Sequence, residues 1–254
     1  MSSANLFSLF SDNFPAQADA VFLDGIDGRQ LRYGELNQRT GQMLSLMKKL
    51  SIKKGDRVVV QVEKSIEAVL LYLGCLRAGV IYIPLNTAYT SNEVNFFLGD
   101  ASPQLFVCMP NRLDELKSVA QRQGVPELLT LGAAGDGELM AAVSSMPECE
   151  DIANIATDDL AAILYTSGTT GRSKGAMLSH GNLAANARVL FAYWHWQNND
   201  VLLHALPIYH VHGLFVALHC ALLGASRVIF MPRFEVSTVL QKLPESTVMM
   251  GVPT

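Results

Sequence analysis

A short run of small, hydroxylated and basic residues is the part of this sequence best suited to chemistry. Residues 165–176 read YTSGTTGRSKGA and hold three Gly, three Thr, two Ser and two cations, with no acid among them. Backbone N–H groups in such a loop can surround an anion, hydroxyl groups add donors, and a lysine adds a full charge. Phosphate is therefore the ligand that this composition favours.

The loop departs from the P-loop of nucleotide-binding proteins at two positions. Counted from Gly168, Lys174 stands at the required offset, but Ser173 replaces the second glycine and Gly175 replaces the hydroxyl residue that would hold Mg²⁺. A P-loop also leads directly into a helix, whereas the apolar run GAMLS follows here. An ordinary surface hairpin is the simplest alternative, but hairpin connections are usually about two to five residues long. The sequence therefore predicts a phosphate-binding loop of another kind.

The composition and net charge of the chain exclude several classes of protein. The chain has 254 residues, of which 50% are hydrophobic and 17% charged, and its formal net charge is −4. A chain of this size can bury a large core, and its acidic balance argues against a nucleic-acid partner. Four scattered Cys without a CxxC pair indicate reduced thiols in a cytoplasmic protein. The apolar run at 213–223 is too short to cross a bilayer, so we expect no membrane insertion.

Strands that alternate with helices must position the loop. Apolar periodicity and capping signals predict helices at about 34–50, 65–79, 90–98, 114–124, 138–146, 180–194 and 213–223, with a short one after Phe234. Runs rich in apolar and β-branched residues predict strands at about 57–62, 80–86, 104–108, 127–131, 160–167, 175–179, 201–207, 227–232 and 247–253. This alternation predicts an α/β fold of layered, largely parallel sheets with helices on both faces.

The loop and its neighbours resemble one enzyme family. YTSGTTGRSKGA is similar to the phosphate-binding signature of the adenylate-forming enzymes, which include acyl-CoA synthetases, luciferases and the adenylation domains of peptide synthetases. ALPIYHVHGL and GDRVVVQVEKSIEAVLLYLGCLRAGVIYIPLN also resemble that family, so the likeness covers about 22–254. Ser173 departs from it, because most members carry Pro there. Within the family, VQVEKS, PLNTAYT, HVHGLFVAL and MGVPT most resemble the malonyl-CoA synthetases.

The resemblance implies a ligase of fatty acid metabolism that works in two steps. A carboxylic acid, with malonate favoured, would react with ATP to give an acyl-adenylate, and CoA would then take the acyl group. ATP, Mg²⁺ and CoA are the implied cosubstrates and cofactors. Three alternatives stay open: a short- or medium-chain or aryl acyl-CoA synthetase, an adenylation domain that loads a carrier protein, and a binding module that keeps the phosphate loop without catalysis.

The resemblance also implies roles for single residues. The residues that would wrap the ATP phosphates are Thr166, Ser167, Gly168, Thr169, Thr170 and Gly171, and Lys174 would add charge as pyrophosphate departs. His210 would lie near the α-phosphate and the acyl carboxylate, with Tyr209 as its aromatic neighbour. If 209–212 is extended, His212 would share a side with His210 and could meet a second substrate carboxylate; packing against the backbone is the alternative. Arg233 is another cation that could supply this charge.

The histidines could suggest a metal centre, because all six fall between His180 and His219. No Cys or carboxylate completes a ligand set at suitable spacing. We therefore expect no metal site.

Enzymes of the resembled family are about twice this length, which implies an incomplete N-terminal AMP-binding domain. Residues about 55–190 are expected to form a first αβα subdomain and 1–50 plus 200–254 part of a second, with the C-terminal lid domain absent. We expect the 254-residue chain alone to lack ligase activity. The apolar strand at about 247–253 is expected at a parallel sheet edge, which favours self-association or a homo-oligomer.

Overall fold

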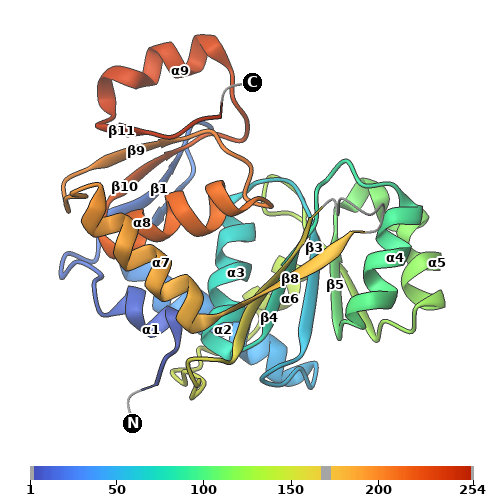
Figure 1. Cartoon of the computed structure of the whole chain (residues 1–254). Coiled ribbons are helices and arrows are strands. Elements are labelled where there is room, and N and C mark those ends of the chain that lie inside the picture. The colour runs from blue at the N-terminus through green and yellow to red at the C-terminus, as the bar shows by residue number, and fades with distance from the viewer. Residues whose placement is uncertain (1–2, 167–172, 253–254) are drawn as a thin grey trace.

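Two sheets flanked by helices make up the structure (Figure 1). The computed structural model describes residues 3–166 and 173–252. The first sheet has the strand order β6-β5-β3-β4-β7-β8, and the second has the order β11-β9-β10-β1-β2. The strands of the first sheet are β3 (Arg57–Gln61), β4 (Ile81–Pro84), β5 (Leu105–Cys108), β6 (Glu127–Thr130), β7 (Leu160–Thr166) and β8 (Lys174–Ser179). Those of the second sheet are β1 (Val21–Gly25), β2 (Gln30–Arg32), β9 (Val201–His204), β10 (Arg227–Phe230) and β11 (Val248–Met249).

Most strand pairs are parallel, as the sequence predicts. Among the strands of residues 3–166 and 173–252, only β7 with β8 in the first sheet and β1 with β2 in the second pair antiparallel. The central strands β3, β4 and β5 are buried at nearly every position, which is typical of parallel strands covered on both faces. The α/β class and the layered, largely parallel architecture are therefore confirmed.

The helices lie between and outside the two sheets. They are α1 (Leu6–Ser11), α2 (Tyr33–Lys49), α3 (Ile66–Ala78), α4 (Ser91–Ala101), α5 (Leu113–Arg122), α6 (Glu138–Ser144), α7 (His180–Tyr193), α8 (Leu218–Leu223) and α9 (Val236–Lys242). Figure 1 shows α3 in the middle of the molecule, where it packs against α1 and α2. All of its residues are buried, which explains why its sequence is apolar on every side.

Local capping chemistry sets the helix ends. The Ser65 hydroxyl accepts from the Ala68 N–H at the start of α3, and Gly79 ends that helix with φ 68°. Only glycine adopts this left-handed conformation without strain. Thr90 and Glu93 form the predicted capping box at the start of α4.

Some elements differ from the predicted ones. The sequence analysis has no counterpart for α1, β1 or β2, which span only three to six residues each and are too short to show a clear period. The helix predicted at 213–223 begins as a π-helical turn, His212–Ala217, and continues as α8. Two 3₁₀ turns, Pro110–Arg112 and Leu243–Glu245, complete the described elements.

The largest core cluster joins the two sheets. It contains Phe22 and Leu202 from the second sheet, Val58 from the first, and much of α2 and α3. The subdomain boundaries at about 55–190 and at 1–50 plus 200–254 stay a prediction. In the described part of the chain, no helix combines the length and apolar character needed to cross a membrane.

A buried arginine ties the end of α3 to the connection that leads into β7. Arg77 is only 3% exposed. Its Nε donates to the Asp151 carbonyl at 2.9 Å and its Nη2 to the Cys149 carbonyl at 2.8 Å. Its Nη1 donates to the Asn37 carbonyl at 2.6 Å and to Thr40 Oγ1 at 2.9 Å. One side chain therefore satisfies acceptors on α2 and on a segment that has no regular structure of its own.

Replacing Arg77 by Met should destabilise the fold by about 3 kcal/mol. The aliphatic stem is retained, but four acceptors lose their donor, and buried polar groups without a partner are costly. Urea unfolding followed by circular dichroism measures the change. Arg188→Met on the exposed side of α7 is the matched control and should stay within about 0.5 kcal/mol of the parent. Equal unfolding midpoints for the two variants would contradict this role for Arg77.

Candidate active site

The carboxyl ends of strands from both sheets surround one cavity of about 780 Å³. Its walls come from the segments that follow β3, β4, β6, β9, β10 and β11. In open α/β folds, ligands bind in crevices at the carboxyl ends of the strands. The position of this cavity therefore marks it as a candidate substrate site.

The cavity combines an apolar wall with a few polar groups. The apolar part includes Leu206, Ile208 and Phe234. The polar side chains of the lining are Glu63, Lys64, Thr87, Tyr209 and Arg233. The lining carries two basic side chains and one carboxylate, a set of groups that can accept an anion with an apolar part.

The predicted phosphate loop joins β7 to β8. These strands form an antiparallel hairpin in which Thr166 pairs with Lys174, and both residues are exposed. The two strands therefore pair as in the hairpin alternative, which the sequence favoured less than a phosphate-binding loop. The predicted phosphate ligands Ser167, Gly168, Thr169, Thr170 and Gly171 lie outside the described residues.

An anchored tyrosine fixes the strand end from which the loop leaves. The hydroxyl of Tyr165 donates to Asp100 Oδ2 at 2.6 Å, and its ring lies 4.5 Å from that of Phe97. Burial raises the pKa of Tyr165, and the hydrogen bond to Asp100 raises it further. The neutral tyrosine therefore ties the end of β7 to α4.

The Tyr209 and His210 rings lie side by side after β9, with centroids 4.6 Å apart. Tyr209 lines the cavity and His210 is exposed. His212 is the first residue of the π-helical turn. Because 209–212 is a turn that leads into a helical turn, the extended geometry on which the His212 prediction depends is wrong. His212 is also not part of the cavity lining described above.

A hydrogen-bonded chain holds the segment that carries Tyr209 and His210. His204 Nε2 lies 2.9 Å from the Gly213 carbonyl; since a carbonyl only accepts, Nε2 carries the proton. Nδ1 is then an acceptor, and Lys64 Nζ donates to it at 2.6 Å and to the His204 carbonyl at 2.9 Å. Burial lowers the pKa of His204 well below its usual value, which agrees with a neutral ring.

The sequence alone did not reveal these hydrogen bonds between Lys64, His204 and the Gly213 carbonyl. Neither Lys64 nor His204 was expected to be a functional residue. The signal is that Lys64 follows a buried strand at the carboxyl edge of the sheet, where polar side chains meet ligands. The pairing with His204, 140 positions away, is a tertiary contact that no local pattern indicates.

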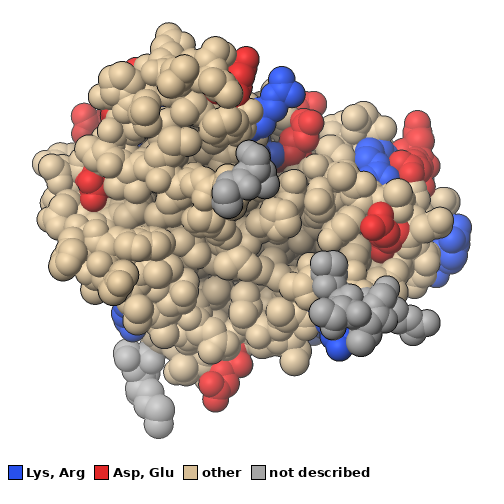
Figure 2. All heavy atoms as spheres, turned by 45° about the horizontal axis from the view of Figure 1, so that its top comes forward, with Lys and Arg blue, Asp and Glu red and all other residues tan. Residues whose placement is uncertain are grey.

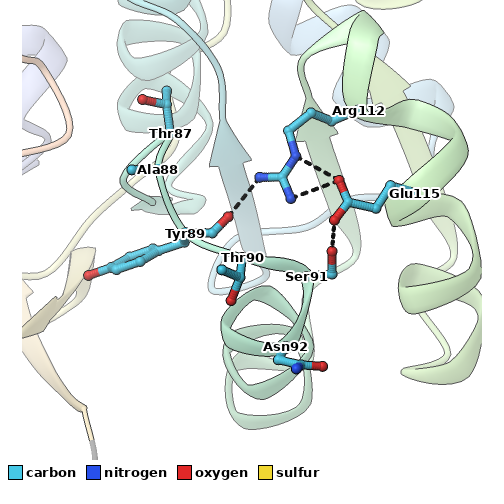
Figure 3. A pocket seen from close by; sticks show the side chains of 8 residues that line it. All are labelled: Thr87, Ala88, Tyr89, Thr90, Ser91, Asn92, Arg112 and Glu115. Carbon is cyan, nitrogen blue, oxygen red and sulfur yellow. Dashed lines mark hydrogen bonds and ion pairs between the residues drawn. The ribbon is translucent and has the colours of Figure 1, made fainter.

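A second hollow of about 570 Å³ lies next to the first, and Thr87 lines both. Figure 3 shows the Arg112 guanidinium directed at Glu115 and at the Tyr89 carbonyl. Its Nη2 lies 3.0 Å from Glu115 Oε2 and its Nη1 lies 2.7 Å from the Tyr89 carbonyl. Ser91 Oγ donates to the same carboxylate. The guanidinium is thus engaged by protein partners that stiffen the wall of this hollow.

Charges of both signs share the molecular surface. On the face shown in Figure 2, some Lys and Arg side chains lie beside Asp and Glu side chains and others stand apart, and they do not gather in one patch of a single sign. Within residues 3–166 and 173–252, no three His, Cys, Asp or Glu side chains are grouped to hold a metal ion.

Known proteins resemble this chain over nearly its whole length. The AMP-binding enzyme family matches residues 10–254. The mitochondrial malonate–CoA ligase ACSF3 of Mus musculus is 34% identical, covering 78% of this chain and 34% of its own length. The malonate–CoA ligase of Arabidopsis thaliana is 29% identical, covering 99% of this chain and 46% of its own length.

A solved structure is also similar to this chain. The crystal structure of ATP-bound MatB from Rhodopseudomonas palustris superimposes with a TM-score of 0.95 at 44% identity, covering 99% of this chain and 50% of MatB. The chain thus spans half or less of the length of these relatives.

Proposed function

The chain belongs to the AMP-binding enzyme family, and on that premise we propose that it acts in an ATP-dependent, AMP-forming ligase that joins malonate to CoA. The observation that carries the proposal is the 44% identity to ATP-bound MatB at a TM-score of 0.95 over 99% of the chain. The malonate–CoA ligases of mouse and Arabidopsis point to the same acid. ATP, CoA and malonate are the proposed substrates.

The proposed reaction has two balanced steps. A malonate oxygen attacks the α-phosphorus of ATP, the bond to the β-phosphate oxygen breaks, and pyrophosphate leaves with the electron pair. The CoA thiolate then attacks the activated carbonyl carbon, and the bond to AMP breaks. Both steps bring anionic groups together, so the enzyme contributes mainly positioning and charge neutralisation.

The phosphate loop supplies the charge neutralisation. Thr166 and Lys174 stand opposite each other where β7 and β8 meet the loop. We assign the Lys174 ammonium to the charge that develops as pyrophosphate leaves. The predicted donors Ser167, Gly168, Thr169, Thr170 and Gly171 would bind the β- and γ-phosphates. The anchored Tyr165 holds the strand that presents this loop.

The cavity supplies the positioning, because it orients the acid. Tyr209 lines it next to His210, and we assign His210 to the reacting carboxylate. Bound Mg²⁺ would neutralise phosphate charge.

One observation favours a second candidate function. Leu206, Ile208 and Phe234 give the cavity an apolar wall that malonate alone does not need. This wall suits a short- or medium-chain or aryl acid, so an acyl-CoA synthetase of that class is the alternative.

Product analysis tests the proposal. The protein produced from its complete reading frame is incubated with ATP, Mg²⁺ and malonate, with either CoA or an acyl-carrier protein as acceptor. We expect malonyl-CoA and AMP in equal amounts, with little transfer to the carrier. Transfer to the carrier without malonyl-CoA would assign the chain to the carrier-loading class, and benzoyl- or butyryl-CoA formation without malonyl-CoA would favour the apolar-acid alternative.

A further inference from the structure

Lys64 brings an amine to the candidate substrate cavity that the proposed reaction does not use. It lines the cavity of about 780 Å³ together with Tyr209 and Arg233, and it also lines a neighbouring cavity of about 380 Å³. The Tyr209 ring lies beside that of His210, which the proposed function assigns to the reacting carboxylate. The amine therefore shares a cavity with the acyl group that the enzyme activates.

Hydrogen bonds to one histidine orient this amine. Lys64 Nζ donates to His204 Nδ1 at 2.6 Å and to the His204 carbonyl at 2.9 Å, and it lies 4.4 Å from the centre of the Phe230 ring. A neutral amine has two N–H groups and one lone pair, so His204 engages both of its protons. The lone pair takes part in neither of these hydrogen bonds.

The surroundings of the amine favour its neutral form. Within residues 3–166 and 173–252, Lys64 takes part in no ion pair. Burial lowers the pKa of Lys64 well below its usual value, because a charged amine loses hydration there. Arg233, whose guanidinium stays charged, keeps a cation in the same lining. A lysine held neutral in this way is a nucleophile toward carbonyl groups.

We propose that Lys64 is a self-acylation site, to which the acyl-adenylate formed in the cavity transfers its acyl group when CoA is scarce. This inference rests on the proposed function, which supplies the acyl-adenylate. The Nζ lone pair attacks the carbonyl carbon, a C–N bond forms, and the bond to the AMP oxygen breaks with its electron pair leaving on AMP. The amine loses one proton through the N–H directed at His204 Nδ1. The products are an amide, AMP and a proton.

Acylation of Lys64 blocks further turnover. The new amide is attached to the wall of the cavity that the next acid must enter, so its acyl chain takes up space that the substrate needs. CoA competes with Lys64 for the same acyl-adenylate, and the enzyme is protected while its second substrate is present. Self-acylation thus stops adenylate formation when the acyl acceptor is exhausted.

Peptide mass spectrometry tests the assignment on the unaltered protein from the complete reading frame. The protein is incubated with ATP, Mg²⁺ and malonate without CoA, and is then digested with a protease that does not cleave at lysine. Malonylation of Lys64 should exceed that of Lys117, an exposed lysine on α5, at least about tenfold, because the Lys64 amine is held in the cavity of the adenylate. It should require ATP and decrease when CoA is added. Equal labelling of the two lysines would overturn the proposal.

The stability of ligase activity gives a second readout. Preincubation with ATP and malonate without CoA should lower the rate of malonyl-CoA formation in step with the labelled fraction of Lys64. Lys64→Arg keeps a long basic side chain whose guanidinium stays protonated and does not form this amide. Its own initial rate, whatever its size, should survive the same preincubation, whereas Lys117→Arg should lose activity as the parent does. Loss of activity in Lys64→Arg at the parent rate would contradict the proposal.

Preformed butyryl-adenylate separates this inference from the proposed function. Added in place of ATP and malonate, it should acylate Lys64 in preference to Lys117. If this labelling occurs but malonate supports no exchange of pyrophosphate into ATP, the proposed function fails while the acylation site stands. If Lys64 stays unlabelled by butyryl-adenylate, the acylation site is overturned whether or not that exchange occurs.

Discussion

Malonate should be used with a kcat/KM at least about a thousandfold above that of butyrate. A site that pairs with a charged group of the substrate leaves its own buried polar groups unpaired when the substrate lacks that group. Such sites discriminate by large factors in kcat/KM against the analogue without the group. In this chain the lining of the cavity carries the basic side chains of Lys64 and Arg233, to which a monocarboxylic acid offers no second carboxylate. The apolar wall formed by Leu206, Ile208 and Phe234 lowers this preference, because the butyrate methyl group can pack against it.

Steady-state kinetics of acyl-CoA formation with the two acids measures this preference, at saturating ATP and CoA. Propionate and succinate extend the comparison, because they separate chain length from the second charge. Comparable kcat/KM values for malonate and butyrate would contradict the malonate assignment and point to a general short-chain acyl-CoA ligase.

Lys174→Ala should slow formation of the acyl-adenylate about a hundredfold. The proposed role of Lys174 is to meet charge that develops as pyrophosphate leaves, and losing one such electrostatic contact typically costs a factor of this size. Lys174 begins β8 and is exposed, so the substitution removes little packing. The fold should therefore be unaffected, and the loss should appear in kcat more than in the KM for malonate.

Acid-dependent exchange of labelled pyrophosphate into ATP measures this step without CoA. Lys117→Ala, an exposed lysine on α5, should exchange at the parent rate. A Lys174→Ala protein that exchanges at the parent rate would contradict the role assigned to the loop.

Elements with strong local signals could be predicted from the sequence. The apolar run of α3 with its Ser65 cap and Gly79 stop, and the capping box of Thr90 and Glu93, are found where the sequence places them. These features depend on neighbours within a few residues, so the sequence holds all the information that they need. The apolar strands β3, β4 and β5 are recognised for the same reason.

Other features depend on contacts between distant parts of the chain. β2 has three residues and gains its place only by pairing with β1. The turn at 209–212 replaces the expected extended segment, and His204 joins the Gly213 carbonyl that lies just beyond this turn. No periodic pattern in the sequence predicts the hydrogen bond between His204 and the Gly213 carbonyl. The sequence therefore locates the strand ends that bear the candidate site, but not the contact between Lys64 and His204 across the two sheets.

The central claim is that this chain belongs to an enzyme that activates malonate as an adenylate. Malonate-dependent exchange of labelled pyrophosphate into ATP, by the protein produced from its complete reading frame, tests that claim most directly. We predict exchange that requires malonate, proceeds without CoA, and stops when AMP-forming cleavage is blocked by an ATP analogue with a non-cleavable α,β-bridge. Cleavage of ATP to ADP and phosphate, or no exchange with malonate or any other carboxylic acid, would contradict the account.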